Sequence, residues 1–151
     1  MTRRMLPKSS ANVAEVIRLA NEIARAFDLE YVGTEHILLA IARVNKGIGA
    51  QVLAKRGITN ERLHDEIDKL VENRKEETWV FGRLPGTPHF RNVVATAIDQ
   101  CQQLEAKELC TEHLLLALLK EVGCTGYKAL KNLGLTYEKV RKDVLELATP
   151  S

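Results

Sequence analysis

The residues best placed to bind a ligand occur twice, in two closely similar heptapeptides. The sequence TEHILLA at 34–40 returns as TEHLLLA at 111–117, and each time a threonine, a carboxylate and an imidazole precede an apolar run. That order is typical of the first turn of a helix, where backbone N–H groups have no partner inside the helix. Two such helix starts could receive a ligand that carries both an anion and a guanidinium. Glu35 and Glu112 are therefore the candidate ligand-binding residues.

The same residues also have a structural interpretation, which the sequence leaves open. Thr34 and Thr111 are good N-cap residues, and an acid in the first turn of a helix complements the helix dipole. His36 and His113 could simply form hydrogen bonds inside the protein. On this interpretation the two motifs stabilise helices and bind nothing.

Cysteine and histidine side chains provide further candidates for chemistry. Cys110 lies three residues before His113, and a helix N-terminus favours the thiolate form, so a small thiol enzyme is one alternative. Gly33 precedes the first heptapeptide at the equivalent position, which favours Cys110 as a small residue in a tight turn. We therefore expect no enzyme. No Cys-x-x-Cys or His-Glu-x-x-His spacing occurs, so we also expect no metal and no cofactor.

Composition and motif content argue against several other functions. The chain has no Gly-x-x-x-x-Gly-Lys-Ser/Thr loop, so it should not hydrolyse ATP. Its net charge is +2 and its basic residues are dispersed among acids, so nucleic-acid binding is not expected. No segment approaches the roughly 20 apolar residues of a membrane helix. Three cysteines without a secretory signal favour a cytoplasmic or similarly reducing compartment.

The two heptapeptides belong to a longer internal repeat with a fixed offset of 77 residues. The offset also pairs Gly49 with Gly126, Leu53 with Leu130, Gly57 with Gly134 and Thr59 with Thr136. An open solenoid needs about three repeats, so two copies favour a closed pair related by a pseudo-twofold axis. We predict a single domain over 1–151, with the first copy at 10–73, a linker at 74–87 and the second copy at 88–148.

Apolar spacing predicts the same four helices in each copy. Between 12 and 28, apolar residues recur every three or four positions, as on an amphipathic helix with one buried face. The helix that begins with each Thr-Glu-His motif is apolar on nearly every side and should be central. A short third helix should end at Gly57 or Gly134, and a fourth should begin after Thr59 or Thr136. Strand signals are absent, so the predicted fold is all-α.

The linker carries the only tryptophan of the chain, Trp79, close to Phe81. Large aromatic side chains bury about 150 to 250 Å² each, which favours a segment that folds back over the groove between the copies. Tryptophan is also common at the centre of protein interfaces, so the two residues could instead anchor a partner.

Taken together, the repeated motifs resemble the Clp N-terminal repeat domain. The resemblance rests on the doubled Gly/Cys-Thr-Glu-His-Ile/Leu-Leu-Leu motif, on the Gly-x-x-x-Leu and Gly-Ile/Leu-Thr motifs that follow it, and on Thr87-Pro88 at the opening of the second copy. It covers about residues 9–148. That domain precedes the ATPase modules of ClpC- and ClpA-type AAA+ unfoldases. The resemblance implies a non-enzymatic, all-helical chaperone domain of two four-helix repeats.

The resemblance also implies partners and binding residues. The family docks adaptor proteins and unfolded substrates for an AAA+ unfoldase that works with a Clp peptidase, and ClpC-type members recognise phosphorylated arginine. By motif, Glu35 and Glu112 would contact the guanidinium, and Ser10 and Thr87 the phosphate. The expected partners are thus a Clp ATPase or peptidase, adaptors, and unfolded or arginine-phosphorylated substrates.

The chain departs from the family pattern at several positions. Ser9-Ser10 replaces Phe-Thr, Cys110 replaces the usual glycine, and residues 123–126 lack the acidic loop of ClpC. No ATPase module follows the second copy, so we expect either a free-standing accessory or adaptor protein or an excised domain. A helical scaffold unrelated to proteolysis, whose Trp79 segment binds a partner helix, is a further alternative.

Overall fold

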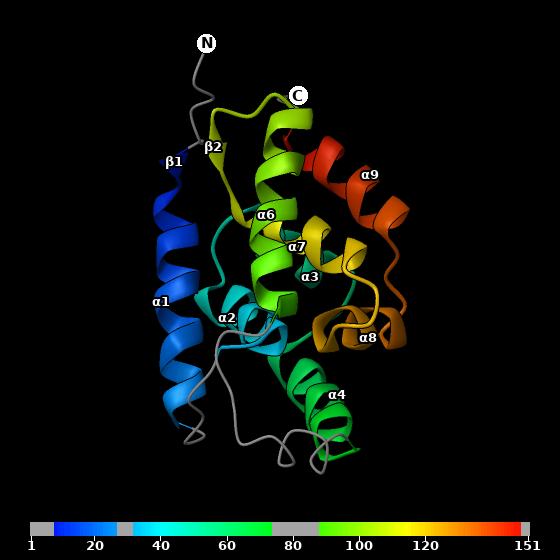
Figure 1. Cartoon of the computed structure of the whole chain (residues 1–151). Helices are drawn as coiled ribbons and strands as arrows, with labels where there is room; N and C mark the ends of the chain where they lie inside the picture. The colour runs from blue at the N-terminus through cyan, green and yellow to red at the C-terminus, as the bar shows by residue number, and fades with distance from the viewer. Residues whose placement is uncertain (1–7, 27–31, 74–87, 149–151) are drawn as a thin grey trace.

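Eight helices form most of the part that the computed structural model describes, which comprises residues 8–26, 32–73 and 88–148 (Figure 1). The first copy contains α1 (Ala11–Ala26), α2 (Thr34–Val44), α3 (Ile48–Lys55) and α4 (Asn60–Asn73). The second copy contains α6 (Pro88–Gln103), α7 (Thr111–Lys120), α8 (Thr125–Asn132) and α9 (Tyr137–Ala148). The prediction of an all-α fold built from two four-helix repeats is confirmed.

The predicted turn between the third and fourth helices of each copy is also confirmed. Gly57 and Gly134 have φ angles of 73° and 93°, a left-handed conformation that glycine adopts without strain. The hydroxyls of Thr59 and Thr136 then accept hydrogen bonds from backbone N–H groups three residues later, at 3.1 and 3.2 Å. This is the contact of an N-cap residue, so both copies restart their last helix in the same way.

The two helices that begin with the Thr-Glu-His motifs lie at the centre of the molecule. Residues 34–41 of α2 and 111–119 of α7 are all buried, as predicted for helices apolar on nearly every side. α2 packs against α1, α3, α4 and α8, whereas α7 packs against α6, α3, α8 and α9.

No single helix among the described residues is long and apolar enough to cross a membrane, although the bent pair α2 and α3 meets that test by length and composition.

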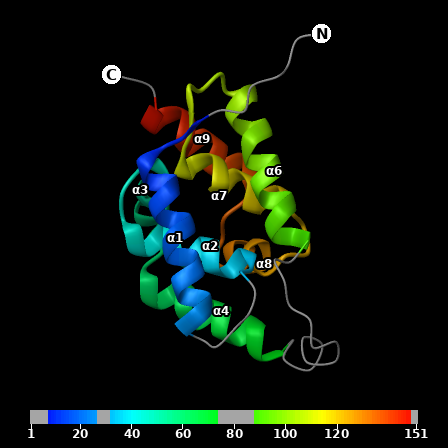
Figure 2. The same ribbon diagram turned by 60° about the vertical axis from the view of Figure 1, so that its left-hand side comes forward.

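The third helix of each copy packs against the other copy. α3 lies against α7 and α9, and α8 lies against α2 and α4, two arrangements related by the 77-residue offset (Figure 2). Buried leucines from both helices, Leu53 and Leu130, belong to a single hydrophobic core. Each copy therefore completes its core with a helix of the other.

Two equivalent hydrogen bonds stabilise this exchange of helices. Thr111 Oγ1 accepts the Gly49 N–H at 3.0 Å, and Thr34 Oγ1 accepts the Gly126 N–H at 3.0 Å. Both glycines are the second residue of their helix, where the backbone N–H has no acceptor inside the helix. Each threonine therefore caps a helix of the other copy.

The prediction that Thr34 and Thr111 cap their own helices is wrong. The N-cap positions of α2 and α7 are Gly33 and Cys110, both with an extended backbone. Each threonine is the first helical residue, and its hydroxyl faces the third helix of the other copy. A glycine in that helix lets the hydroxyl approach to hydrogen-bonding distance. The tertiary contact therefore overrides the local capping preference of threonine.

A pair of very short strands brings the starts of α1 and α7 together. β1 (Lys8–Ser9) pairs in parallel with β2 (Glu108–Leu109), and the Ser10 N–H donates to the Leu109 carbonyl at 2.9 Å (Figure 1). The sequence predicts no strand, because two residues are too few to show an alternating pattern. The pair leaves the all-α class unchanged, but it places Ser10 next to the Thr-Glu-His motif of the second copy.

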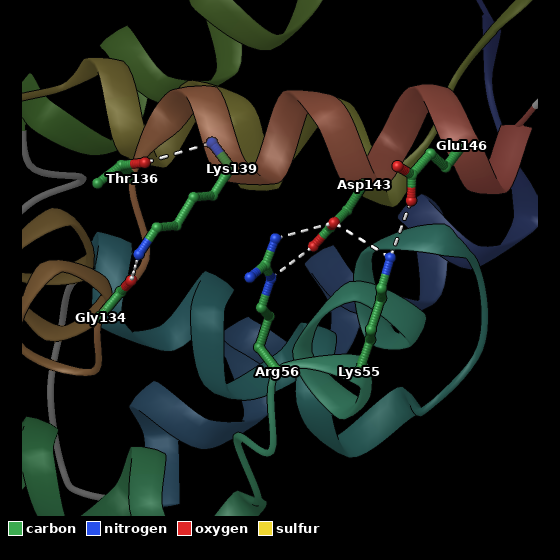
Figure 3. A network of polar contacts seen from close by, with 7 residues as sticks. All are labelled: Lys55, Arg56, Gly134, Thr136, Lys139, Asp143 and Glu146. Atoms are coloured by element: carbon green, nitrogen blue, oxygen red, sulfur yellow. Dashed lines mark hydrogen bonds and ion pairs between the residues drawn. The ribbon is translucent and has the colours of Figure 1, made fainter.

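A buried carboxylate joins α3 of the first copy to α9 of the second (Figure 3). Asp143 accepts hydrogen bonds from Arg56 Nε at 2.7 Å and Nη2 at 2.9 Å, and Lys55 Nζ lies 3.3 Å from it. These contacts, chiefly the one with Arg56, lower the pKa of Asp143 although the side chain is buried. By the 77-residue offset, Lys55 corresponds to Asn132 and Asp143 corresponds to Glu66. These two residues form one hydrogen bond, in which Asn132 Nδ2 donates to Glu66 Oε2 at 2.8 Å.

Candidate functional site

Polar side chains from both copies meet where α1 and α7 begin. We call Ser10, Cys110, Glu112 and His113 the α1–α7 cluster. Ser10 is the N-cap of α1, because its Oγ accepts the Val13 N–H at 3.2 Å. Its hydroxyl also contacts the Cys110 thiol, and a Glu112 carboxylate oxygen lies within 4.8 Å of the same sulfur. Two predicted site residues from different copies, Ser10 and Glu112, are therefore brought together.

The start of α1 offers backbone hydrogen-bond donors to this cluster. α1 begins at Ala11, one residue before the predicted start, and the predicted end at 28 lies outside the described residues. The N–H groups of Ala11 and Asn12 have no acceptor inside the helix, and none is found elsewhere in the described part of the chain. The positive end of the helix dipole also lies here, so the position favours an anion.

Glu112 presents a buried carboxylate without a cationic partner. The residue is 8% exposed, and burial raises the pKa of its carboxyl, against the opposing effect of its own backbone N–H. Within 8–26, 32–73 and 88–148, no lysine, arginine or other side-chain donor pairs with it. An unpaired buried carboxylate is costly, so a positively charged ligand would be stabilised at this position.

The two motif histidines act as hydrogen-bond acceptors for their own helix starts. His113 Nδ1 accepts the Cys110 N–H at 2.8 Å, and His36 Nδ1 accepts the Gly33 N–H at 2.8 Å. Burial lowers the pKa of His113 to about 4, so its ring is uncharged at neutral pH. The predicted hydrogen bonds of both histidines inside the protein are confirmed.

The Cys110 thiol is not arranged as a nucleophile. Burial raises its pKa to about 11, the Glu112 carboxylate adds to the rise, and the Ser10 hydroxyl opposes it. His113 Nδ1 is occupied by the Cys110 backbone N–H, while the thiol lies 3.5 Å from the Glu108 carbonyl oxygen. A thiolate–imidazolium pair requires a lowered thiol pKa, so this geometry argues against the alternative of a thiol enzyme.

In the first copy the equivalent glutamate has a different environment. Glu35 is 3% exposed, and a Cβ on Gly33 would lie 2.5 Å from its Oε1. The Glu35 carboxylate therefore occupies the space that a side chain at 33 would need. Cys110 has a Cβ at the equivalent place, so Glu112 cannot adopt that position. The two glutamates are thus equivalent by sequence but differ in structure.

Both copies match one known protein family. A sequence profile of the Clp repeat (R) N-terminal domain matches residues 8–121 and also residues 86–150. The chain belongs to the Clp N-terminal domain family. The resemblance that rests on the doubled Thr-Glu-His motif is therefore confirmed.

Curated relatives of this Clp N-terminal domain are much longer proteins. The chain is 31% identical over 143 residues to the negative regulator of genetic competence ClpC/MecB of Bacillus subtilis. It is 32% identical over 143 residues to chaperone protein ClpB of Oceanobacillus iheyensis. Each alignment covers 95% of this chain and 17% of the relative. The chain thus spans about a sixth of the length of these relatives.

Solved structures of Clp-type N-terminal domains have the same fold. The N-terminal domain of ClpD from Arabidopsis thaliana superposes with a TM-score of 0.69 at 14% identity, covering 94% of this chain and 98% of that one. The Hsp104 N-terminal domain from Candida albicans superposes with a TM-score of 0.66 at 16% identity, and the match covers 93% of this chain and 91% of that one. At these identities the likeness concerns the fold alone.

Three predicted site residues of this Clp N-terminal domain lie outside the described residues. Thr87, Trp79 and Phe81 all belong to the predicted linker at 74–87. The phosphate-side role of Thr87 and the partner anchor therefore stay predictions. The sequence also shows no link between Ser10 and Glu112, because the strand pair that joins them is too short to leave a pattern.

Proposed function

We propose that this Clp N-terminal domain is a protein-interaction module that binds adaptors or substrates for a Clp ATPase or peptidase and performs no catalysis itself. Its relatives include a protein named as an ATP-binding subunit of the ATP-dependent Clp protease and a chaperone, and the chain corresponds to 17% of each. The three free thiols fit a cytoplasmic or similarly reducing compartment.

The observation that carries the proposal is the buried carboxylate of Glu112 beside the start of α1, which pairs with no cation among residues 8–26, 32–73 and 88–148. A phosphorylated arginine carries a guanidinium and a phosphate next to each other. Glu112 would accept the guanidinium, while the Ser10 hydroxyl and the N–H groups of Ala11 and Asn12 would donate to the phosphate. Each half of the ligand thus meets the group that complements its charge.

A second, weaker site would use the first copy. Glu35 would accept the guanidinium there, and Thr87, which directly precedes Pro88 in the sequence, would contact the phosphate. Pro88 is the first residue of α6 and has no N–H, so this helix start offers one backbone donor fewer than α1. We therefore expect the site at Glu112 to contribute more of the binding.

Affinity purification from the source cell tests the broader part of the proposal. A tagged full chain should recover a Clp ATPase or a Clp peptidase ring, because a module of this family would act with one of them. A known Clp adaptor, tagged in the same way, provides the positive control. Recovery of neither assembly under conditions in which the control adaptor recovers them would contradict the role in Clp proteolysis.

A further inference from the structure

The starts of α2 and α7 have nearly the same backbone geometry. Their N-cap residues, Gly33 and Cys110, have φ and ψ angles of −113° and 177° and of −116° and 171°. Each N-cap residue donates its N–H to Nδ1 of the motif histidine at 2.8 Å. Each N-cap carbonyl accepts the N–H of that histidine, at 3.1 Å in α2 and 3.0 Å in α7. The main difference between the two helix starts is therefore the N-cap side chain, which glycine lacks.

In the first copy the glutamate of the motif folds back over its own N-cap residue. A Cβ on Gly33 would lie 2.5 Å from Glu35 Oε1, 3.1 Å from its Cδ and 3.3 Å from its Oε2. Non-bonded carbon atoms pack best at about 3.5 to 4.0 Å, so a contact this short between a Cβ and a carboxylate oxygen is repulsive. The folded-back conformation of the glutamate therefore requires glycine at the N-cap.

Cys110 excludes this conformation in the second copy. Because the backbone is equivalent, the Cys110 Cβ occupies the space that the folded-back carboxylate would need. A Glu112 carboxylate oxygen lies instead within 4.8 Å of Cys110 Sγ, and this sulfur contacts the Ser10 hydroxyl. Glu112 is also the more exposed of the two glutamates, at 8% against 3% for Glu35. The Cys110 side chain thus keeps Glu112 near Ser10.

We propose that Cys110 is a positioning residue, which keeps the Glu112 carboxylate available to a guanidinium because it excludes the folded-back conformation. This inference rests on the function proposed above. A protein that is only partly in its binding-competent conformation binds more weakly by the fraction that is competent. Glu35 must leave Gly33 before it can meet a ligand, whereas Glu112 pays no such cost. The difference between Gly33 and Cys110 therefore assigns the tighter site to the second copy.

Calorimetric titration of the full chain with a peptide that contains one phosphoarginine tests this role. In Cys110→Gly the glutamate should fold back, and if about 90% of the molecules do so, binding weakens about tenfold. Cys110→Ala restores the Cβ without the thiol and should recover the affinity that Cys110→Gly loses. In a Glu112→Gln background, Cys110→Gly should cause no further loss, because its effect acts through that carboxylate. An equal loss in Cys110→Gly and Cys110→Ala would overturn the proposal.

A crystal structure of the free Cys110→Gly protein tests the same role without a ligand. Its Glu112 carboxylate should lie over residue 110, as the Glu35 carboxylate lies over Gly33. The reciprocal variant Gly33→Ala should displace Glu35, since alanine fits the extended backbone at this position. A Glu112 side chain that keeps its wild-type position in Cys110→Gly would overturn the proposal, whatever the peptide does. A folded-back Glu112 in this variant, in a protein whose wild type binds no phosphoarginine peptide, would instead overturn the function proposed above, and with it the role of Cys110 in binding.

Discussion

Replacing Gly49 with alanine is expected to lower the free energy of unfolding by about 2 to 4 kcal/mol. A Cβ at this position would lie 3.0 Å from Thr111 Cβ and 3.1 Å from the Thr111 carbonyl carbon. A backbone atom cannot rotate away, so α3 must move off α7 and the hydrogen bond between Gly49 N–H and Thr111 Oγ1 weakens. The loss should exceed the roughly 1 kcal/mol by which alanine favours an isolated helix.

Gln51→Ala is the matched control for this prediction, because Gln51 is exposed on the same helix. Its effect should stay within about 0.5 kcal/mol. Urea unfolding of both variants, followed by circular dichroism, measures the difference. A Gly49→Ala protein as stable as the wild type would show that α3 does not pack this closely against α7.

Acidification between pH 6.5 and 4 is expected to remove about 3 kcal/mol of stability through His113 alone. Its pKa is about 4 in the folded protein and 6.5 without burial, so the unfolded chain binds more protons between these values. The contribution of His113 is therefore complete above pH 6.5 and is lost as the pH falls toward 4. The pKa of Glu112 is raised, so its protonation in the folded state offsets part of this loss.

The pH dependence of unfolding in wild type and His113→Asn measures this effect. Asparagine can accept the Cys110 N–H through its side-chain oxygen but cannot be protonated, while all other titrating groups are shared by the two proteins. The wild type should lose about 3 kcal/mol more than the variant over this range. Parallel pH profiles would show that His113 is not buried as a neutral ring.

Features that depend on neighbouring residues were predictable from the sequence. Gly57 and Thr59 mark the end of one helix and the start of the next because glycine tolerates a left-handed turn and threonine caps a helix. The apolar runs of α2 and α7 indicate central helices, because a helix without a polar face must be buried on all sides. The 77-residue offset then predicts the second copy from the first.

Contacts between the copies were not predictable in the same way. Nothing local shows that Thr111 serves α3 of the other copy instead of its own helix. Asp143 lies among apolar positions of α9, and only the folded structure shows that Arg56 neutralises it. Residues that act over long sequence separation leave no pattern in a single sequence.

The candidate site was predictable only in part. The repeated motif marks Glu112 directly, and the family resemblance marks Ser10. Their meeting depends on the two-residue strand pair and on Cys110, which lies between them. The difference between Glu35 and Glu112 likewise depends on a single side chain, since Gly33 leaves space that Cys110 fills.

Calorimetric titration with a phosphoarginine peptide tests the ligand site at Glu112 most directly. The wild type should bind this peptide and not the same peptide with unmodified arginine. The double variant Glu35→Gln, Glu112→Gln should bind at least about tenfold more weakly, because each glutamate supplies a charged hydrogen-bond acceptor worth roughly 1.5 to 3 kcal/mol. Glu61→Gln, Glu138→Gln is the matched control, since these exposed first-turn acids are also 77 residues apart and should leave binding unchanged. Equal affinity in wild type and the Glu35, Glu112 variant would contradict the proposed site.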